Sequence, residues 1–198
     1  MTHPVTWPDE REPKPAPGSL ARVQALVNTV DLSGGTDRLA DPATARSWLV
    51  ANELLGASGR LAAADLELVR EVREALRALL VANAGGPAPT AAELAPLRAV
   101  AERGAARAEI DDDGSVRLVR ADDSVRGRLV GVLLAIRDAQ RDGTWGRLKA
   151  CANAECRWAF YDRSRNRGGS WCDMASCGNR MKNRDFRARR RGRAGGAG

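Results

Sequence analysis

The 198-residue sequence predicts a mainly helical protein: an N-terminal helical domain with a small β-hairpin, followed by a small cysteine-containing finger. Three observations predict this class. Apolar residues recur at helical spacing through most of the chain, the four cysteines all lie in its last quarter, and its charge is uneven. Residues 144–198 carry 14 Lys and Arg against 4 Asp and Glu, although the net charge of the whole chain is only +7. We therefore expect a nearly neutral domain joined to a basic module.

Composition divides the chain into four stretches. Residues 1–18 hold five of the nine prolines and predict a disordered arm. Residues 19–143 form the helical domain, residues 145–191 the finger with a basic helix, and residues 192–198 a flexible tail. No apolar run approaches the ~20 residues that span a bilayer, and the N-terminus lacks the apolar core of a signal peptide. These features predict a cytoplasmic protein with no membrane partner.

The first half of the helical domain contains three predicted helices. A helix over 19–30 places its apolar residues near one face, and glycines after it end it. The second begins at Asp41, an N-cap residue, with Pro42 at the first helical position. The third, over 63–84, carries a continuous apolar stripe and ends at a Gly-Gly-Pro sequence.

The second half of this domain mixes helices with one hairpin. Thr90 and Glu93 form a capping box for a helix that ends near Gly104. The segments ARAEI and SVRLV flank an Asp-Gly turn and predict a β-hairpin, after which Ser124 caps a last helix. The chain's one histidine, His3, lies in the arm, and no catalytic set of residues can be assembled. We therefore expect that the protein is not an enzyme.

The cysteines are spaced C-x4-C-x15-C-x4-C: Cys151, Cys156, Cys172 and Cys177. Two close pairs separated by a hairpin-length spacer favour one structural Zn²⁺ with four thiolate ligands. An iron–sulfur cluster, disulfides and a thiol redox switch are the alternatives. A module this small cannot build a strong core, so metal binding is expected to supply most of its folding energy.

The sequence around the cysteines predicts the shape of the finger. GRLKAC reads as a strand that enters the first cysteine pair, RWAFYD as a strand that leaves it, and the second pair precedes a basic helix. This order is typical of a treble-clef-like zinc finger. Trp158, Phe160, Trp171 and Phe186 are expected to pack beside the metal.

The clustered arginines predict contact with the phosphates of a nucleic acid, and the asparagines among them can add hydrogen bonds. DNA is favoured over RNA, which would gain if Trp158 and Phe160 were exposed for stacking. A protein-interaction module that meets an acidic partner is a further alternative, and a merely solvated basic face is the simplest one. The candidate contact residues are Arg163, Arg165, Asn166, Arg167, Asn179, Arg180, Lys182, Asn183, Arg184, Arg187, Arg189, Arg190 and Arg191.

The stretch CANAECRWAFYDRSRNRGGSWCDMASCGNRMKNRDFRARRR resembles the CGNR zinc-finger family, which is named for the Cys-Gly-Asn-Arg found here at 177–180. Upstream, LVNTV at 26–30 and DPATARSWLVANELL at 41–55 are similar to the helical ABATE domain that precedes this finger. The resemblance covers roughly residues 19–191. It implies a bacterial, stress-associated transcription regulator in which the four cysteines bind zinc and the basic helix contacts DNA.

Our hypothesis is a regulator with two parts. The helical domain senses a small-molecule effector or forms a homodimer, and the four-cysteine finger binds DNA mainly through phosphates. An RNA-binding protein and a zinc-stabilised protein-interaction module remain the alternative functions.

Overall fold

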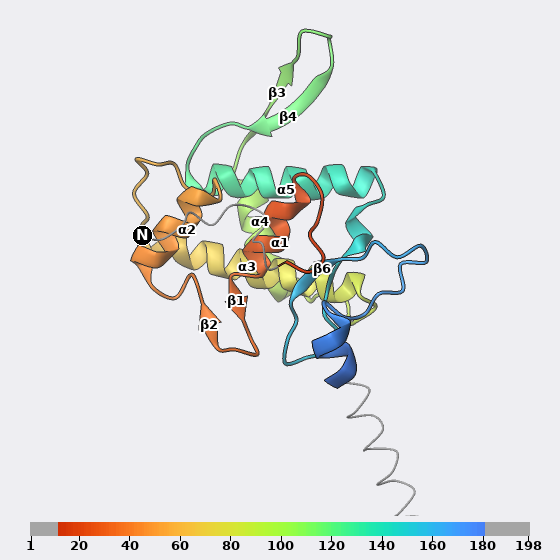
Figure 1. Cartoon of the computed structure of the whole chain (residues 1–198). Helices are drawn as coiled ribbons and strands as arrows, with labels where there is room; N and C mark the ends of the chain where they lie inside the picture. Colours follow the sequence, from red (N-terminus) through yellow and green to blue (C-terminus); the bar gives the residue numbers. More distant parts are fainter. Residues whose placement is uncertain (1–11, 181–198) are drawn as a thin grey trace, which may run out of the picture.

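The computed structural model describes residues 12–180, and the mainly helical class is confirmed (Figure 1). The body is built from helices that pack around the long α3, while short antiparallel strand pairs lie at its margins. The α-helices are α1 (Leu20–Val27), α2 (Pro42–Ala51), α3 (Ala63–Asn83), α4 (Ala91–Arg103) and α5 (Val125–Arg141).

Three predicted helix starts are confirmed by their caps. The Asp41 carboxylate accepts a hydrogen bond from the Thr44 N–H at 2.8 Å, and the Ser124 hydroxyl accepts one from the Gly127 N–H at 3.0 Å. Thr90 and Glu93 form the reciprocal capping box of α4. Each cap satisfies N–H groups that the first helical turn leaves without a partner.

Helix α1 is shorter than the sequence suggested. It ends at Val27, and the chain then forms a small hairpin of β1 (Val30–Asp31) and β2 (Thr36–Asp37). The Asp31 carboxylate accepts hydrogen bonds from the N–H groups of Ser33 and Gly34, which tightens this turn. Two-residue strands carry too little periodicity to be read from a sequence.

The remaining strands form two hairpins. One pairs β3 (Ala106–Ile110) with β4 (Val116–Arg120), as the Asp-Gly turn predicted, and projects beyond α5 (Figure 1). The other pairs β5 (Leu148–Ala150) with β6 (Ala159–Tyr161) and carries the first two cysteines between its strands.

The second hairpin joins the finger to the helical domain. Leu148 and Ala159 are fully buried in the same core as Leu76 and Leu80 of α3, and Tyr161 joins them. Strand β5 packs against α3, and the Asn83 side chain of that helix donates to the Leu148 carbonyl at 2.9 Å. The hairpin of the finger is therefore a structural part of the helical domain, and only the cysteine-bearing loops have a small core of their own.

Residues 12–18 belong to the stretch 1–18 that the sequence predicts to be disordered, but in the structure hydrogen bonds hold them against the body of the protein. The Lys14 carbonyl accepts a hydrogen bond from the Tyr161 N–H at 2.9 Å, which attaches this segment to β6. The Lys14 ammonium group lies 4.9 Å from the centre of the Phe160 ring and donates to the Trp171 carbonyl. Ala16 is buried against α1. We call residues 12–18 the N-terminal strap. Its prolines favour an extended backbone, which suits a segment that runs along the surface of the body.

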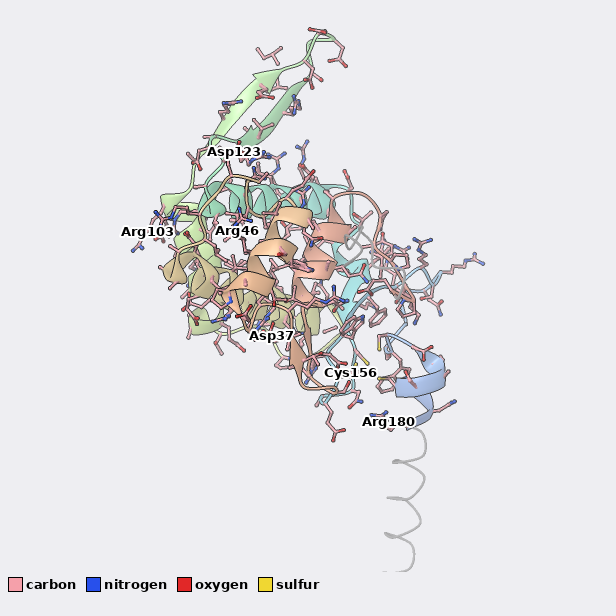
Figure 2. All side chains as sticks on the ribbon, turned by 60° about the vertical axis from the view of Figure 1, so that its left-hand side comes forward. Asp37, Arg46, Arg103, Asp123, Cys156 and Arg180 are labelled. Carbon is pink, nitrogen blue, oxygen red and sulfur yellow. The ribbon has the colours of Figure 1, made fainter. Side chains whose placement is uncertain are left out.

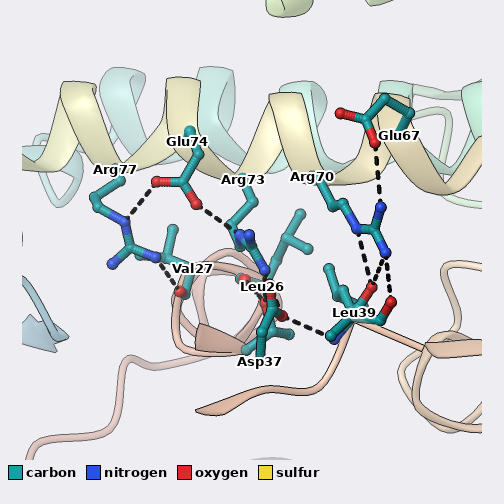
Figure 3. A network of polar contacts seen from close by, with 11 residues as sticks. Leu26, Val27, Asp37, Leu39, Glu67, Arg70, Arg73, Glu74 and Arg77 are labelled. Atoms are coloured by element: carbon teal, nitrogen blue, oxygen red, sulfur yellow. Dashed lines mark hydrogen bonds and ion pairs between the residues drawn. The ribbon is translucent and has the colours of Figure 1, made fainter. Parts of the chain in front are cut away.

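Buried arginines of α3 attach the neighbouring segments to that helix (Figure 3). Arg73 donates to Asp37 at 2.7 Å and to Glu74 at 2.7 Å. Arg77 donates to Glu74 at 3.0 Å, to the Val27 carbonyl at the end of α1 at 2.8 Å, and to the Arg157 carbonyl in the finger at 3.0 Å. These bonds satisfy carbonyl groups at chain turns that have no helical partner.

Candidate metal centre and nucleic-acid interface

The structure brings the four cysteines into one buried cluster. The sulfur atoms of Cys151, Cys156, Cys172 and Cys177 all lie within 4.8 Å of one another. The Cys156 and Cys172 sulfurs are 3.7 Å apart. Ligands of a tetrahedral zinc with Zn–S bonds of about 2.3 Å are separated by about 3.8 Å, whereas a disulfide requires about 2.05 Å. The cluster therefore fits a metal ion with four thiolate ligands.

The backbone around the first cysteine pair turns its N–H groups toward the sulfurs. The Cys151 sulfur accepts from the Asn153 N–H, and the Cys156 sulfur accepts from the Trp158 N–H, in each case two residues further along the chain. Arg157, between them, has a φ of 50°, a conformation that costs most residues about 1 kcal/mol. Its N–H donates to the Asn153 carbonyl at 3.0 Å, and its carbonyl accepts from Arg77, so both sides of this turn are held.

The thiols influence one another's protonation strongly. The hydrogen bond with Cys156 lowers the pKa of Cys151 to about 2 and raises the pKa of Cys156 to about 12. Hydrogen bonds with Cys151 and Cys156 also raise the pKa of Cys172. A cation is therefore needed for these sulfurs to be thiolates together, and its binding would displace protons.

Aromatic residues pack against the cysteine cluster as the sequence predicted, except that Phe186 lies outside the described residues. Phe160 is fully buried, and Trp158 and Trp171 are half-buried beside it. The Trp158 Nε1–H donates to Glu12 of the N-terminal strap at 3.1 Å. Phe160 has no exposed ring face on which a base could stack, whereas Trp158 is only half-buried.

A buried ion pair supports the arginine-containing loop that follows β6. The Lys149 ammonium lies 2.9 Å from the Asp162 carboxylate, with both side chains buried. Burial raises the pKa of Asp162, but hydrogen bonds from Ser164 and Lys149 outweigh it and hold that pKa below its usual range. The Gly169 N–H also donates to Asp162, at 2.7 Å, and a Cβ at Gly169 would lie only 2.8 Å from the carboxylate carbon. The two ends of the loop are thus joined through one carboxylate.

The described nucleic-acid candidates are all at the surface. Arg163, Arg165, Asn166 and Arg167 are exposed on this loop, and Asn179 and Arg180 are exposed just after Cys177. Figure 2 shows Cys156 and Arg180 at the same end of the molecule. Arg163 donates to the Pro15 carbonyl of the strap at 3.0 Å. Within residues 12–180, neither Arg165 nor Arg180 forms an ion pair.

The other candidates lie outside the described residues. They are Lys182, Asn183, Arg184, Arg187, Arg189, Arg190 and Arg191.

Sequence reasoning missed the polar contacts that join α1 to the finger. Asn28 pairs with Ala159 as a strand would: its Oδ1 accepts from the Ala159 N–H at 2.7 Å, and its Nδ2 donates to the Ala159 carbonyl at 3.0 Å. Gln24 donates to the same carbonyl at 3.1 Å. The signal was the polar pair itself, because Gln24 and Asn28 are one helical turn apart on the side of α1 that carries its apolar residues.

The fold and the site define a class of protein: a helical domain that shares its core with a four-cysteine, metal-binding finger. Residues 147–190 match the CGNR zinc finger. Residues 20–152, more than half of the chain, match the ABATE family, described as "Putative stress-induced transcription regulator". The chain belongs to the ABATE family and carries a CGNR zinc finger. A search of curated proteins found no match.

Between residues 12 and 180, no helix is both long enough and apolar enough to span a bilayer.

Proposed function

We propose that the protein is a transcription regulator that binds DNA through its zinc-ordered finger. The observation that carries the proposal is the contrast on the finger between its buried cysteine cluster and its exposed arginines without carboxylate partners. Unpaired guanidinium groups on an ordered surface suit phosphate contact, because their charge is available and their position is fixed. The sequence that continues beyond Arg180 is rich in arginine, which adds to the positive charge of this part of the chain.

Zinc would be held by Cys151, Cys156, Cys172 and Cys177, where it supplies folding energy to the finger. Four cysteine ligands leave the ion no open position for a substrate, so the proposal includes no enzymatic activity. Thiols must stay reduced to bind the ion, and this requirement favours a cytoplasmic location.

We also propose that a small-molecule effector binds to the helical domain. An open groove of about 900 Å³ lies between α3 and α4, and its lining includes Arg77, which contacts the finger, and Ala78. Metabolites that bind there should raise the melting temperature of the wild-type protein but not of Ala78→Trp, which fills the groove. A shift that persists in the variant would place the ligand elsewhere.

The experiment is the selection of fragments from sheared genomic DNA by the zinc-loaded full chain at near-physiological salt. Truncation before the finger would remove Leu148 and Tyr161 from the core, so the control is the intact triple variant Arg165→Ala, Arg167→Ala, Arg180→Ala. A few promoter fragments, lost with the variant, are the expected result. Retention of single-stranded RNA in preference to DNA would support the RNA alternative, and no retention of either would support a protein-interaction module.

A further inference from the structure

The β3–β4 hairpin is the most exposed element of the described chain. It projects from the body beyond α5, whereas the finger lies at the opposite end of the molecule (Figures 1 and 2). Every residue of its two strands is exposed except Glu109 and Val119, which are half-buried.

The two faces of this hairpin differ in chemistry. One face is mostly apolar and open to solvent: it carries Ala106, Ala108, Ile110, Val116 and Leu118, of which Ile110 is 75% and Val116 69% exposed. Its one charged residue, Arg120 at the base of the hairpin, pairs with Asp123. The other face carries charges that pair among themselves. There Arg107 and Arg117 both contact Glu109 at 2.7 Å, and Arg117 contacts Asp111 at 2.9 Å. An apolar hairpin face ordinarily packs on a core, so its exposure here indicates that a partner covers or extends it.

The outer edge of β3 is free to pair. The Asp111 N–H donates to the Ser115 carbonyl and the Ala121 N–H donates to the Ala105 carbonyl, so the odd-numbered residues of β3 bond to β4. By the alternation of an antiparallel ladder, the backbone groups of Ala106, Ala108 and Ile110 point to the open edge. This edge has no lysine, proline or bulge, the usual devices that prevent strand addition.

We propose that β3 pairs antiparallel with β3 of a second copy of this chain, with the two-fold axis at Ala108. Ala106 then forms a hydrogen-bonded pair with Ile110 of the second copy. Arg107 lies opposite the second copy's Glu109, at a non-hydrogen-bonded position, where opposed side chains are closest. Both contacts occur twice because the axis repeats them.

Charge selects this register and this partner. If the two-fold axis moved to Arg107, the backbone pairing would be kept but Arg107 would face Arg107 of the second copy. If it moved to Glu109, Glu109 would face Glu109. The charges of the hairpin's polar face balance, two arginines against Glu109 and Asp111, so the edge attracts neither a polyanion nor a basic protein. The order Arg-Ala-Glu is complementary to itself when antiparallel, which favours a second copy. The strands alone bury less than the about 1,200 Å² of a standard interface, so the dimer is expected to be weak.

The test is sedimentation equilibrium of the zinc-loaded full chain from micromolar to near-millimolar concentration. Ala108→Pro removes an N–H from the proposed pairing edge, and the matched control Leu118→Pro removes one from the opposite, open edge of β4. Neither N–H takes part in the β3–β4 ladder. The wild type and Leu118→Pro are expected to reach the mass of two chains, and Ala108→Pro to remain at one.

A charge experiment tests the register. Arg107→Glu or Glu109→Arg alone places like charges opposite each other twice and should weaken association about tenfold. An equimolar mixture of the two variants should restore it, because the glutamates of one chain then face the arginines of the other. A wild-type mass of one chain throughout, a dimer that survives Ala108→Pro, or a mixture that is no stronger than its components would overturn the proposal. None of these measurements depends on DNA binding.

Discussion

The arginines of α3 and those of the finger show the same side chain in two opposite roles. Arg73 and Arg77 are 6% exposed, and both guanidinium groups bond to Glu74 (Figure 3). Arg73 also donates to Asp37, and Arg77 donates to carbonyl groups of other segments. Arg165 and Arg180 are exposed and have no ion-pair partner within residues 12–180. The first pair stabilises the fold, and the second leaves its charge available to a ligand. The net charge of a sequence cannot distinguish these roles.

Arg77 connects the two regions. Arg77 donates both to the end of α1 and to the Arg157 carbonyl beside Cys156. Loss of structure in the finger should therefore destabilise the helical domain as well.

Removal of zinc is expected to have the largest effect, since it acts on both regions. Chelation, or Cys172→Ser, should abolish DNA retention and lower the melting temperature by about 10 °C, because several kcal/mol of folding energy are lost and β5 and β6 belong to the main core. Calorimetry and fragment retention measure this, and added zinc should reverse the chelation. An unchanged melting temperature would contradict the shared core.

Arg77→Met should lower the free energy of unfolding by about 2–4 kcal/mol, because buried carbonyls of Val27 and Arg157 lose their donor. The DNA affinity of the folded protein should not change. Chemical denaturation measures the loss, and the exposed Arg98→Met on α4 is the matched control, with a change within about 0.5 kcal/mol. Equal effects of the two substitutions would remove the distinction between buried and exposed arginines.

Asp162→Asn should lower the free energy of unfolding by about 1–3 kcal/mol, because Lys149 stays buried without a carboxylate partner. Since the folded pKa of Asp162 is depressed, its contribution is present above the ordinary carboxyl pKa of about 3.9 and is lost as the pH falls through the folded value. Chemical denaturation of the wild type and of Asp162→Asn measures this. The difference between their free energies of unfolding should be constant between about pH 6 and 8 and should narrow only in strong acid. A difference that changes near neutral pH would argue for another titrating group.

Arg165→Ala should have the smallest effect. Loss of one phosphate contact weakens DNA binding a few-fold and lowers the slope of log affinity against log salt by about 1, while stability stays within about 0.5 kcal/mol. Fluorescence anisotropy across a salt series measures the slope. A variant with the wild-type slope would show that Arg165 faces away from the DNA.

Much of the fold could be predicted from local signals. Asp41 with Pro42, the Thr90–Glu93 box and Ser124 mark helix starts through chemistry within one turn, and the Asp-Gly turn fixed the β3–β4 hairpin. The strap at residues 12–18 was misread as disorder. Its stability comes from contacts with β6 and α1, and composition carries no information about such distant partners.

The candidate site likewise has features that the sequence predicted and others that it did not. Spacing was enough to predict the cluster of four cysteines, because two close pairs separated by a hairpin-length spacer favour one tetrahedral metal site. The supports of the site were not predictable: Lys149 pairs with Asp162, and Asn28 with Ala159 more than a hundred residues away. Each is an ordinary polar residue until the fold buries it beside its partner.

The central claim is that the charge available for DNA lies on the finger. The most direct measurement compares salt slopes of DNA binding for two triple variants that lose the same charge: Arg165→Ala, Arg167→Ala, Arg180→Ala on the finger, and Arg60→Ala, Arg98→Ala, Arg103→Ala on the exposed surface of the helical domain. The account predicts that the finger variant loses about 3 in slope and the other retains the wild-type value. Equal losses, or a loss only in the second variant, would contradict it.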